Sequence, residues 1–350
     1  MLDRMSNLGR PPTSHDVARR AGVSQPTVSR ALRDDPSVSA ETRRLVRAAA
    51  DELGYILSAR GRSLSTRTTG QIGIVVSDLG NPFYLQVLDT AHRALAQAGR
   101  RMLVLTPDGD DEALLARLLD GSLDGAILTT TVLASGVPAA LARRGLPFAL
   151  LNRTIDDAPG DTCVVDNVAG AGLAAQALLR LGHRDIAALL GPQTTSTGRD
   201  REAGFRAVLD AAGVALPADR VRRGPFDFAH GHAGLRAVLA SRPTAVFCAN
   251  DVIALGAFNA LRATGLHVPR DITLIGFDDI AMASWEVFEL TTVRQDIDRM
   301  VQTAADLLLA RIATPGRAPE HVVLEPVLVE RATHGPPAAQ ANATGNASVP

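Results

Sequence analysis

The chain has 350 residues, of which 46% are hydrophobic and 21% charged, a composition typical of a soluble protein with two or three globular units. No apolar run reaches the ~18 residues of a membrane-spanning helix, and the N-terminus lacks the apolar core of a secretory signal. We therefore expect a cytoplasmic protein without a membrane partner. Cys163 and Cys248 lie in separate apolar, strand-like runs, which indicates buried reduced thiols. We expect no metal and no cofactor.

Basic charge is concentrated at the N-terminal end of the chain. Residues 1–70 contain 12 Arg against 7 acidic residues, whereas residues 71–350 contain 24 Arg against 30 acidic residues. The first segment therefore carries a net charge of +5 and the remainder −6. Such a surplus favours a polyanionic partner, although a solvated helical face would also show it.

Two short helices joined by a glycine turn are predicted in the stretch "DVARRAGVSQPTVSRAL" and the residues before it. Thr13 and Asp16 form a capping pair at the start of the first helix, which ends at Gly22. Ser24 is a suitable cap for the second helix, and Pro26 falls in its first turn, where the missing N–H costs nothing. The pattern is that of a helix-turn-helix.

Polar side chains occupy the outer face of the second predicted helix. They are Gln25, Pro26, Thr27, Ser29 and Arg30. Most of these are residue types that hydrogen-bond to base edges and phosphates, and they stand where a recognition helix would present them to DNA. A third helix, from the cap Ser39 to the stop signal Gly54, would support the pair. The alternative is a small helical bundle whose second helix is merely polar.

"DVARRAGVSQPTVSRAL" and the following "VSAETRRLVRAAADELGY" resemble the headpiece of the lac-repressor/gal-repressor family of bacterial transcription regulators. The similarity continues through "IGIVVSDLGNPFY", "LGHRDIAALLGP", "AVFCANDVIALGA", "DITLIGFDD" and "LTTVRQD", so that it spans roughly residues 13–334. The resemblance implies a homodimer on palindromic operator DNA, with the headpiece in the major groove and a hinge helix in the minor groove. It also implies a small-molecule effector held between two lobes.

The expected organisation is a headpiece at 11–56, a hinge at 57–70, an effector-binding and dimerisation core at 71–334, and a disordered tail at 335–350. The hinge is rich in Ser, Thr, Gly and Arg, which is typical of a flexible linker or of a helix that forms on binding. By the resemblance, Leu64 is a wedge between base pairs, and Ala59, Gly61 and Arg62 lie against the minor groove. The candidate DNA-binding residues are Thr13, Ser24, Gln25, Pro26, Thr27, Ser29, Arg30, Tyr55, Ala59, Arg62 and Leu64.

From residue 71 onward, short apolar runs alternate with segments of helical periodicity. The predicted strands are 72–77, 101–107, 125–130, 147–152, 185–191, 244–250 and 272–277. The predicted helices are 84–99, 112–121, 174–182, 201–213, 233–242, 252–265 and 299–313. The strands are continuously apolar, as strands buried on both faces should be. The pattern predicts an α/β fold with two lobes of parallel sheet, similar to a periplasmic binding protein, after an all-α headpiece.

Polar residues follow the predicted strands, where ligands bind in parallel sheets. They are Asp78, Asn81, Phe83, Thr129, Thr130, Asn152, Arg153, Asn250, Asp251, Asp278 and Asp279. Carboxylates, amides and guanidinium groups beside an aromatic face suit a polyhydroxylated ligand, so we expect a sugar or a sugar derivative. For any single Asn or Asp, turn capping explains the position equally well.

The resemblance adds effector contacts outside this set. The combined candidates are Asp78, Asn81, Phe83, Asn152, Arg153, Thr197, Arg201, Phe226, Asn250, Asp278 and Gln295. We further expect Arg201 and Asp278 to lie on opposite sides of one pocket and to contact the same effector; the alternative is a structural ion pair without a ligand role.

Other classes of protein fit the sequence less well. "GAGLAA" at 170–175 matches a dinucleotide fingerprint but lacks the acidic residue that contacts the ribose. His230 and His232 have no third metal ligand nearby in the sequence. A periplasmic sugar receptor needs a signal peptide, and a nucleotide-dependent enzyme needs a phosphate loop or an activated nucleophile. We therefore expect a non-enzymatic, ligand-responsive repressor, and a dimer, because the tail has no leucine heptads.

Overall fold

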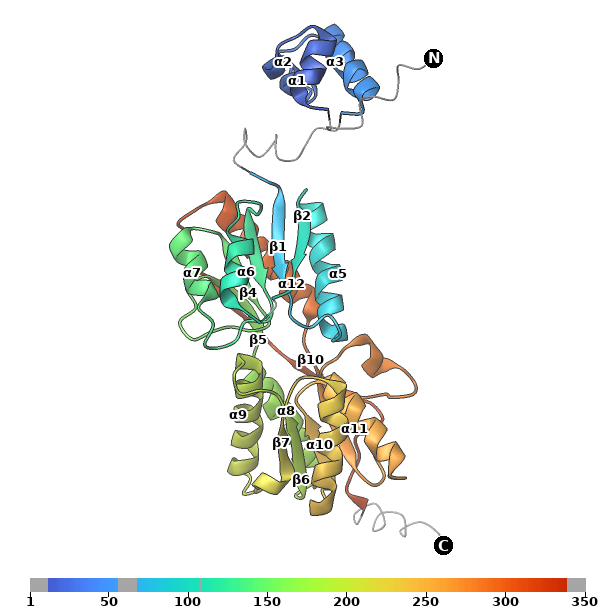
Figure 1. Ribbon diagram of the computed structural model, residues 1–350. Helices are drawn as coiled ribbons and strands as arrows, with labels where there is room; N and C mark the ends of the chain where they lie inside the picture. The colour runs from blue at the N-terminus through green and yellow to red at the C-terminus, as the bar shows by residue number, and fades with distance from the viewer. Residues whose placement is uncertain (1–11, 56–67, 108, 339–350) are drawn as a thin grey trace. The chain divides into compact units, whose positions relative to one another are not determined.

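A computed structural model of the protein describes residues 12–55, 68–107 and 109–338. They fall into two compact units that divide between residues 69 and 70 (Figure 1). The hinge candidates Ala59, Arg62 and Leu64, and Gly61 beside them, lie outside the described residues. Within the described ranges, no helix is both long enough and apolar enough to cross a membrane.

The first unit is a three-helix headpiece of α1 (Ser14–Ala21), α2 (Gln25–Ala31) and α3 (Ala40–Leu53). The predicted caps are present: the side chains of Thr13, Ser24 and Ser39 accept hydrogen bonds from backbone N–H groups two residues inside their helices. Gly22 and Gly54 end α1 and α3 with φ of 69° and 65°, the left-handed conformation that glycine adopts freely. The headpiece core is formed by Val17, Ala18, Val28, Ala31, Val38, Val46, Ala49 and Ala50.

The second unit consists of two lobes, each built on a six-stranded sheet. The first sheet has the order β11-β5-β4-β3-β1-β2, and all its strand pairs are parallel. Its strands are β1 (Gln71–Val75), β2 (Arg101–Leu105), β3 (Gly125–Leu128), β4 (Phe148–Leu151), β5 (Asp161–Val165) and β11 (His321–Leu324). Helices α5 (Pro82–Gln97), α6 (Asp111–Leu118), α7 (Val137–Arg144) and α12 (Ile297–Ala313) cover it.

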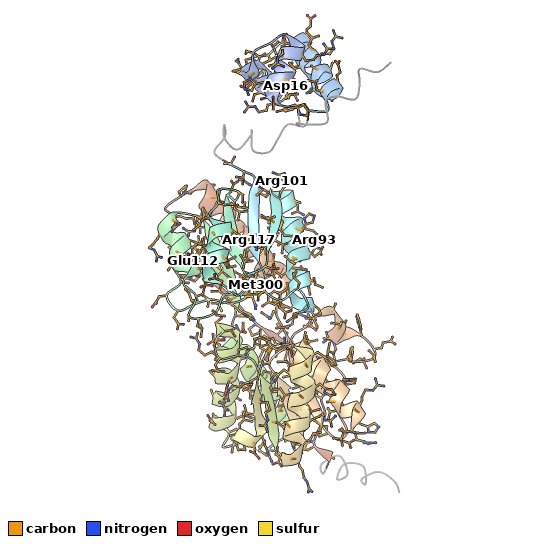
Figure 2. All side chains as sticks on the ribbon, viewed as in Figure 1. Asp16, Arg93, Arg101, Glu112, Arg117 and Met300 are labelled. Carbon is orange, nitrogen blue, oxygen red and sulfur yellow. The ribbon has the colours of Figure 1, made fainter. Side chains whose placement is uncertain are left out.

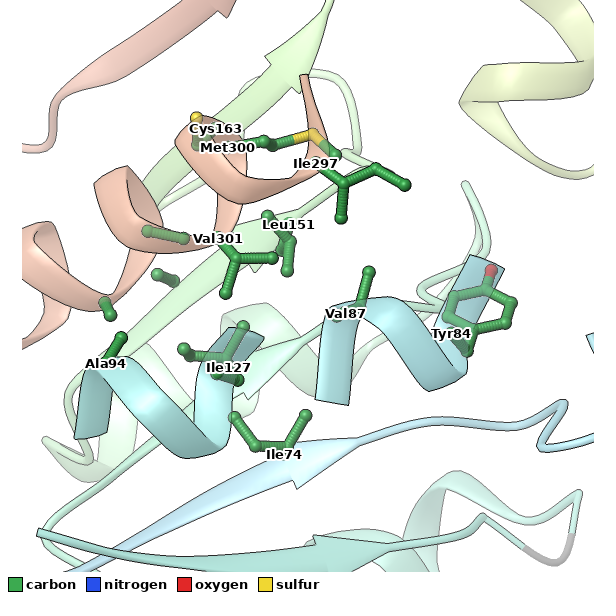
Figure 3. Packing of buried hydrophobic residues seen from close by; sticks show 14 of the residues in the cluster. Ile74, Tyr84, Val87, Ala94, Ile127, Leu151, Cys163, Ile297, Met300 and Val301 are labelled. Atoms are coloured by element: carbon green, nitrogen blue, oxygen red, sulfur yellow. The ribbon is translucent and has the colours of Figure 1, made fainter. Parts of the chain in front are cut away.

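Alternation along these strands separates the two faces of the first sheet. Ile74 packs in one cluster with α5 and α12, whereas the next residue, Val75, packs in another with α6 and α7. Figure 3 shows the first cluster, to which Ile74 of β1, Val87 of α5 and Val301 of α12 belong. Charged side chains project from the outer surfaces of α5 and α6, as Arg93, Glu112 and Arg117 do (Figure 2).

The second sheet has the order β12-β10-β9-β8-β6-β7. Its strands are β6 (Ile186–Leu190), β7 (Val221–Arg223), β8 (Ala245–Cys248), β9 (Thr273–Asp278), β10 (Thr291–Arg294) and β12 (Val327–Val329). Helices α8 (Asn167–Arg180) and α9 (Ser196–Ala211) pack on one face, and α10 (Phe228–Val238) and α11 (Asp251–Ala263) on the other. Three short 3₁₀ turns lie at Ala218–Arg220, Leu239–Ser241 and Ala281–Ser284.

Glycines allow the helices of the second lobe to pack backbone against backbone. A Cβ on Gly204 of α9 would lie 2.1 Å from the carbonyl oxygen of Val168 in α8, and one on Gly256 of α11 would lie 2.2 Å from that of Phe228 in α10. Gly170, in the "GAGLAA" stretch, lies against the ring of Phe277. Close packing between helices therefore accounts for Gly204 and Gly256, and packing of α8 against Phe277 of β9 accounts for Gly170.

The chain passes between the lobes three times, from β5 to α8, from β10 to α12 and from β11 to β12 (Figure 1). Beyond these crossings, specific contacts join the lobes. The N–H of Leu133 donates to the carbonyl of Thr194 at 2.8 Å, and the N–H of Thr154 donates to Oγ of Ser196 at 3.0 Å. Arg199 forms an ion pair with Asp156 at 3.0 Å on the surface.

The parallel α/β prediction is confirmed, although β5, β7, β10, β11, β12 and α7 lie outside the predicted strand and helix ranges. Further differences concern strand direction, strand burial and the tail. β12 runs antiparallel to β10, so the second sheet is not wholly parallel. β2 is an edge strand whose residues are alternately exposed, so it is not buried on both faces as predicted. Gly335, the first residue of the predicted tail, is ordered: its carbonyl accepts from Thr273 at 2.8 Å. Strand position in a sheet depends on neighbours that a local pattern does not reveal.

Candidate functional site

A cavity of about 310 Å³, partly open to solvent, lies where strands of both sheets end. Its lining consists of Asp78, Asn81, Phe83, Tyr84, Asn152, Arg153, Thr197, Arg201, Phe226, Asn250 and Asp278. The structure thus brings together ten of the eleven candidate effector-binding residues, from both lobes. Gln295 is not in the lining. Tyr84 was missed, because in the apolar first turn of a helix it reads as a core residue.

The two asparagines that begin helices at the cavity have local structural roles. Oδ1 of Asn81 accepts a hydrogen bond from the N–H of Phe83 and caps α5. Oδ1 of Asn250 accepts one from the N–H of Ile253 at 2.9 Å and caps α11. Capping, which was the alternative explanation for these residues, therefore holds alongside their place in the lining.

Two other lining residues have an uncommon backbone conformation. Asn152, after β4, has φ of 66°, and Asp278, at the end of β9, has φ of 118°. Asp279, the next residue, has φ of 57°. Non-glycine residues with positive φ are infrequent and carry strain, which a fold retains where the geometry serves a function. One strained strand end in each lobe therefore points to the same cavity.

Arg201 is a buried charged side chain of the cavity, at 2% exposure. Its Nε donates to Oδ1 of Asn167 at 2.8 Å, one of its terminal nitrogens donates to the carbonyl of Ala249 at 2.6 Å, and its guanidinium carbon lies 3.7 Å from the ring centroid of Phe277. The same terminal nitrogen lies 3.1 Å from Oδ1 of Asp278. These three polar contacts of the guanidinium are all made within the second lobe.

The prediction that Arg201 and Asp278 lie on opposite sides of the pocket is wrong. They are a direct ion pair, because β6, which leads into α9, and β9 belong to the same sheet with only β8 between them. Burial raises the pKa of the Asp278 carboxyl, against the opposing effects of Arg201 and Gln295. Burial likewise lowers the pKa of Arg201, which Asp278 opposes. The pair closes one wall of the cavity.

Gln295 supports this pair from outside the cavity. Its Nε2 donates to Oδ1 of Asp278 at 2.6 Å, and its side chain is 3% exposed. Its place at the end of β10, beside Asp278 on the neighbouring strand, accounts for this contact. Gln295 thus contacts Asp278 through Nε2, while its Oε1 is buried without a hydrogen-bond partner, and the effector contact that the resemblance implied for it stays a prediction.

Some polar atoms at the cavity have no partner. Among the described residues, Oδ1 of Asn152 and Nε of Arg153 are buried and accept or donate no hydrogen bond. Buried polar groups are nearly always paired, so such atoms mark a place for a ligand or for water. The ring of Phe226 faces the guanidinium carbons of Arg153 and Arg201 at 5.7 and 6.0 Å. The cavity therefore offers unpaired polar atoms beside an aromatic surface.

Four further residues at strand ends, predicted from the fold rule alone, face away from this cavity. The hydroxyl of Thr129 donates to the carbonyl of Val75. Thr130 lines a different cavity. The Asp251 carboxylate accepts from the N–H of Ile280 and from a threonine hydroxyl, and Asp279 pairs with two arginines. A strand end therefore supplies only some of its residues to the site.

No metal centre is found among the residues that the structure describes: none of their His, Cys, Asp and Glu side chains form a group of three able to hold an ion. Nε2 of His230 is hydrogen-bonded to the carbonyl of Leu190, and burial lowers the pKa of this imidazole. Burial raises the pKa of the Cys163 thiol to about 11.

In the headpiece, the candidate DNA-binding side chains form a polar surface on α2. Pro26 and Arg30 are exposed, and Thr27 shares a hydrogen bond with the cap Ser24 at 2.8 Å. Gln25 is half-buried and donates to Oγ of Ser14 at 3.3 Å, a contact that positions its amide. The hydroxyl of Ser29 accepts from an arginine, the Thr13 hydroxyl donates to Asp16, and the half-buried Tyr55 packs against the headpiece core.

A helix-turn-helix headpiece joined to a two-lobed unit with a polar cavity defines a ligand-controlled DNA-binding regulator. Residues 13–58 match the family described as "Bacterial regulatory proteins, lacI family", and residues 175–334 match the "Periplasmic binding protein-like domain". The ribose operon repressor of Escherichia coli (strain K12) is 34% identical over 325 residues, covering 91% of this chain and 98% of the relative.

Solved structures agree with these matches. The lac repressor dimer bound to operator and the anti-inducer ONPF has a TM-score of 0.81 at 30% identity, covering 93% of this chain and all of that chain. The complex of the transcriptional regulator CelR with cellobiose has a TM-score of 0.71 at 32% identity, covering 92% of this chain and 99% of that chain. The chain belongs to the lacI family of bacterial regulatory proteins, and it is a ligand-responsive DNA-binding repressor.

Proposed function

We propose that the effector is a small saccharide or saccharide derivative, bound in the cavity between the lobes. The observation that carries this proposal is the combination of unpaired polar atoms on Asn152 and Arg153 with the aromatic ring of Phe226. A sugar ring has hydroxyls that both donate and accept and a CH face that packs on an aromatic ring. The relative named ribose operon repressor and the CelR complex with cellobiose support the same class of ligand.

Each lining residue has a proposed role. The Arg201–Asp278 pair, held by Gln295, would offer charged hydrogen-bonding atoms in a fixed position. Asn152 and Arg153 would hydrogen-bond hydroxyls from the first lobe. The remaining contacts would come from Asp78, Asn81, Phe83, Thr197, Phe226 and Asn250. Because both lobes contribute, effector binding would change the equilibrium between open and closed forms. We propose that the chain binds the effector without transforming it.

The DNA side of the proposal rests on α2. Gln25, Thr27, Ser29 and Arg30 would contact the major groove of an operator half-site, as the second helix of a helix-turn-helix does. A homodimer on a palindromic operator is supported by the dimer of the lac repressor structure. Exposed apolar side chains suit such an interface: Leu85 and Leu103 in the first lobe, and Trp285 and Val287 in the second. A regulator of this kind would act in the cytoplasm, where chromosomal DNA lies.

The test uses the domain limits proposed from the sequence, which are a headpiece at 11–56, a hinge at 57–70 and a core at 71–334. Thermal denaturation of the intact protein is followed with sugars, sugar phosphates, sugar acids and nucleobases, since a ligand of the native state raises the melting temperature. The ligand that does so is then added to an operator-binding measurement. We expect a saccharide to raise the melting temperature and to change the operator affinity of the intact protein. A fragment beginning at Gly70 should not bind DNA but should show the same rise in melting temperature. A shift by nucleobases alone would contradict the proposed ligand class.

A further inference from the structure

A second cavity adjoins the effector cavity within the first lobe. It encloses about 760 Å³, partly open to solvent, where β1 and β3 end on the face covered by α6 and α7. Its lining includes buried apolar side chains of Val75, Leu128 and Val137 and the hydroxyl groups of Ser77 and Thr130. The space is larger than that of the effector cavity, and nothing in the proposed function uses it.

Arg153 stands between the two cavities. Among the described residues it is the single side chain that lines both. On the effector side, its guanidinium carbon lies 5.7 Å from the ring centroid of Phe226. On the other side, one of its terminal nitrogens donates to the carbonyl of Thr130 at 3.4 Å. The guanidinium therefore reaches from one cavity to the other and forms part of the wall between them.

This wall is held weakly. A hydrogen bond of 3.4 Å is at the long limit, and Nε of Arg153 is buried without a partner. Within the described ranges no carboxylate forms an ion pair with this guanidinium, in contrast to Arg201, which is paired with Asp278. A side chain that is held by one long hydrogen bond and by a ring contact at 5.7 Å blocks the space mainly by its volume, so shortening it would open the passage.

The lining of the second cavity suits a further ring of a saccharide. Val75, Leu128 and Val137 provide an apolar floor, and the hydroxyls of Ser77 and Thr130 provide hydrogen-bonding groups. A pyranose or an aryl group attached to a sugar presents the matching surface, an apolar face with polar edges. A phosphate or carboxylate would instead need several cationic groups, and Arg153 is the one arginine in this described lining.

We propose that Arg153 sets the size of the effector: it closes the effector cavity against the second one, so that a single sugar ring fits and a second ring is excluded. This inference rests on the proposed saccharide site and deepens it. Replacing Arg153 by a small residue joins the cavities into one site that accepts a disaccharide or an aryl glycoside. Arg153 is then a specificity-determining residue as well as a contact of the first ring.

The experiment compares the intact wild-type protein with Arg153→Ala and with Arg143→Ala. Arg143 is exposed on α7 and lines neither cavity, so its variant removes the same charge elsewhere. Affinities are measured calorimetrically for one-ring probes, D-ribose and D-glucose, and for two-ring probes, cellobiose and phenyl β-D-glucoside. The quantity compared is the ratio of two-ring to one-ring affinity. A merely structural role of Arg153 would weaken both kinds of ligand and leave this ratio unchanged.

We expect the ratio to rise by about tenfold or more in Arg153→Ala and to stay at the wild-type value in Arg143→Ala. Adding Thr130→Phe to Arg153→Ala fills the second cavity and should return the ratio to the wild-type value. One-ring binding with an unchanged ratio in Arg153→Ala would overturn the size limit while leaving the saccharide site intact. If no one-ring saccharide, including those of the thermal screen, binds the wild-type protein or either variant, the saccharide site itself is wrong, and the size limit falls with it.

Discussion

Replacing Asp278 by Asn tests the ion pair at the wall of the effector cavity. The substitution keeps the shape of the side chain and one acceptor oxygen, but it leaves the guanidinium of Arg201, 2% exposed, without its counter-charge. Breaking a buried ion pair by removing one partner destabilises a protein by about 3–5 kcal/mol. Arg201 keeps its hydrogen bonds to Asn167 and to the carbonyl of Ala249. We therefore expect a loss in unfolding free energy near the lower limit, about 3 kcal/mol.

The reciprocal variant, Arg201→Met, should be less destabilising near neutral pH. A carboxyl group can become neutral by taking up a proton, which a guanidinium cannot do, and burial already raises the pKa of Asp278. In this variant the neutral, protonated form of Asp278 stabilises the fold. This contribution is fully present below the ordinary carboxyl pKa of 3.8 and is lost as the pH rises through the raised pKa of Asp278. Stability should therefore fall with increasing pH. The double variant, with both charges removed, should recover much of the loss in Asp278→Asn.

Urea denaturation of the three variants measures these differences, and operator binding with and without the active saccharide measures the response. All three variants should bind operator as the wild type does, because the headpiece is a separate compact unit. They should lose the effector response, because the pair forms a wall of the effector cavity. The electrostatic reasoning fails if Asp278→Asn is no less stable than the double variant. The assignment of this wall to the effector fails if the double variant keeps a full response.

Three further predictions address other parts of the molecule. Gln25→Ala should change which operator half-site is preferred, whereas Arg44→Ala, on an exposed position of α3, should weaken all sequences alike; binding to a panel of operator variants decides this. Gly191→Ala places a Cβ 2.1 Å from the ring of Phe226, so calorimetry should show effector binding weaker by about 0.5–1.5 kcal/mol with the fold retained. Burial raises the pKa of Glu202, but hydrogen bonds from two arginines outweigh it and lower the pKa below the ordinary 4.5. The wild type should thus exceed Glu202→Gln in unfolding free energy by a constant amount above pH 4.5, and this difference should shrink as the pH falls below 4.5. Denaturation curves measure it, and a difference that does not change with pH would contradict the reasoning.

The sequence was most informative where local chemistry decides the structure. The caps at Thr13, Ser24 and Ser39 define helix starts through hydrogen bonds within three residues, so the headpiece could be predicted closely. The polar residues that follow the predicted strands could be assigned to the carboxyl-end edge of each sheet, because parallel strands run in the same direction. The contact between Arg201 and Asp278 could not be predicted, because it depends on the order of strands in the second sheet.

Helix starts were missed for a related reason. α8, α9 and α10 begin at Asn167, Ser196 and Phe228, five to seven residues before their predicted starts at 174, 201 and 233. Their first turns contain glycines, which weaken a helical pattern in isolation. In the fold, Gly231 lies against the backbone of Ile253 in α11, Gly170 against the ring of Phe277 and Gly198 against the carbonyl of Pro192. These tertiary contacts outweigh the low local propensity.

The contacts that join the lobes outside the three chain crossings also limit how strongly a ligand can act. Two hydrogen bonds, from the N–H groups of Leu133 and Thr154, and the exposed pair of Arg199 with Asp156 must break if the lobes separate at this side. Each such hydrogen bond contributes about 0.5–1.5 kcal/mol and an exposed ion pair about 0–1 kcal/mol. Their total is comparable with the 1–3 kcal/mol typical of coupling between two binding sites. A ligand with a coupling of that size would therefore be enough to offset these three contacts.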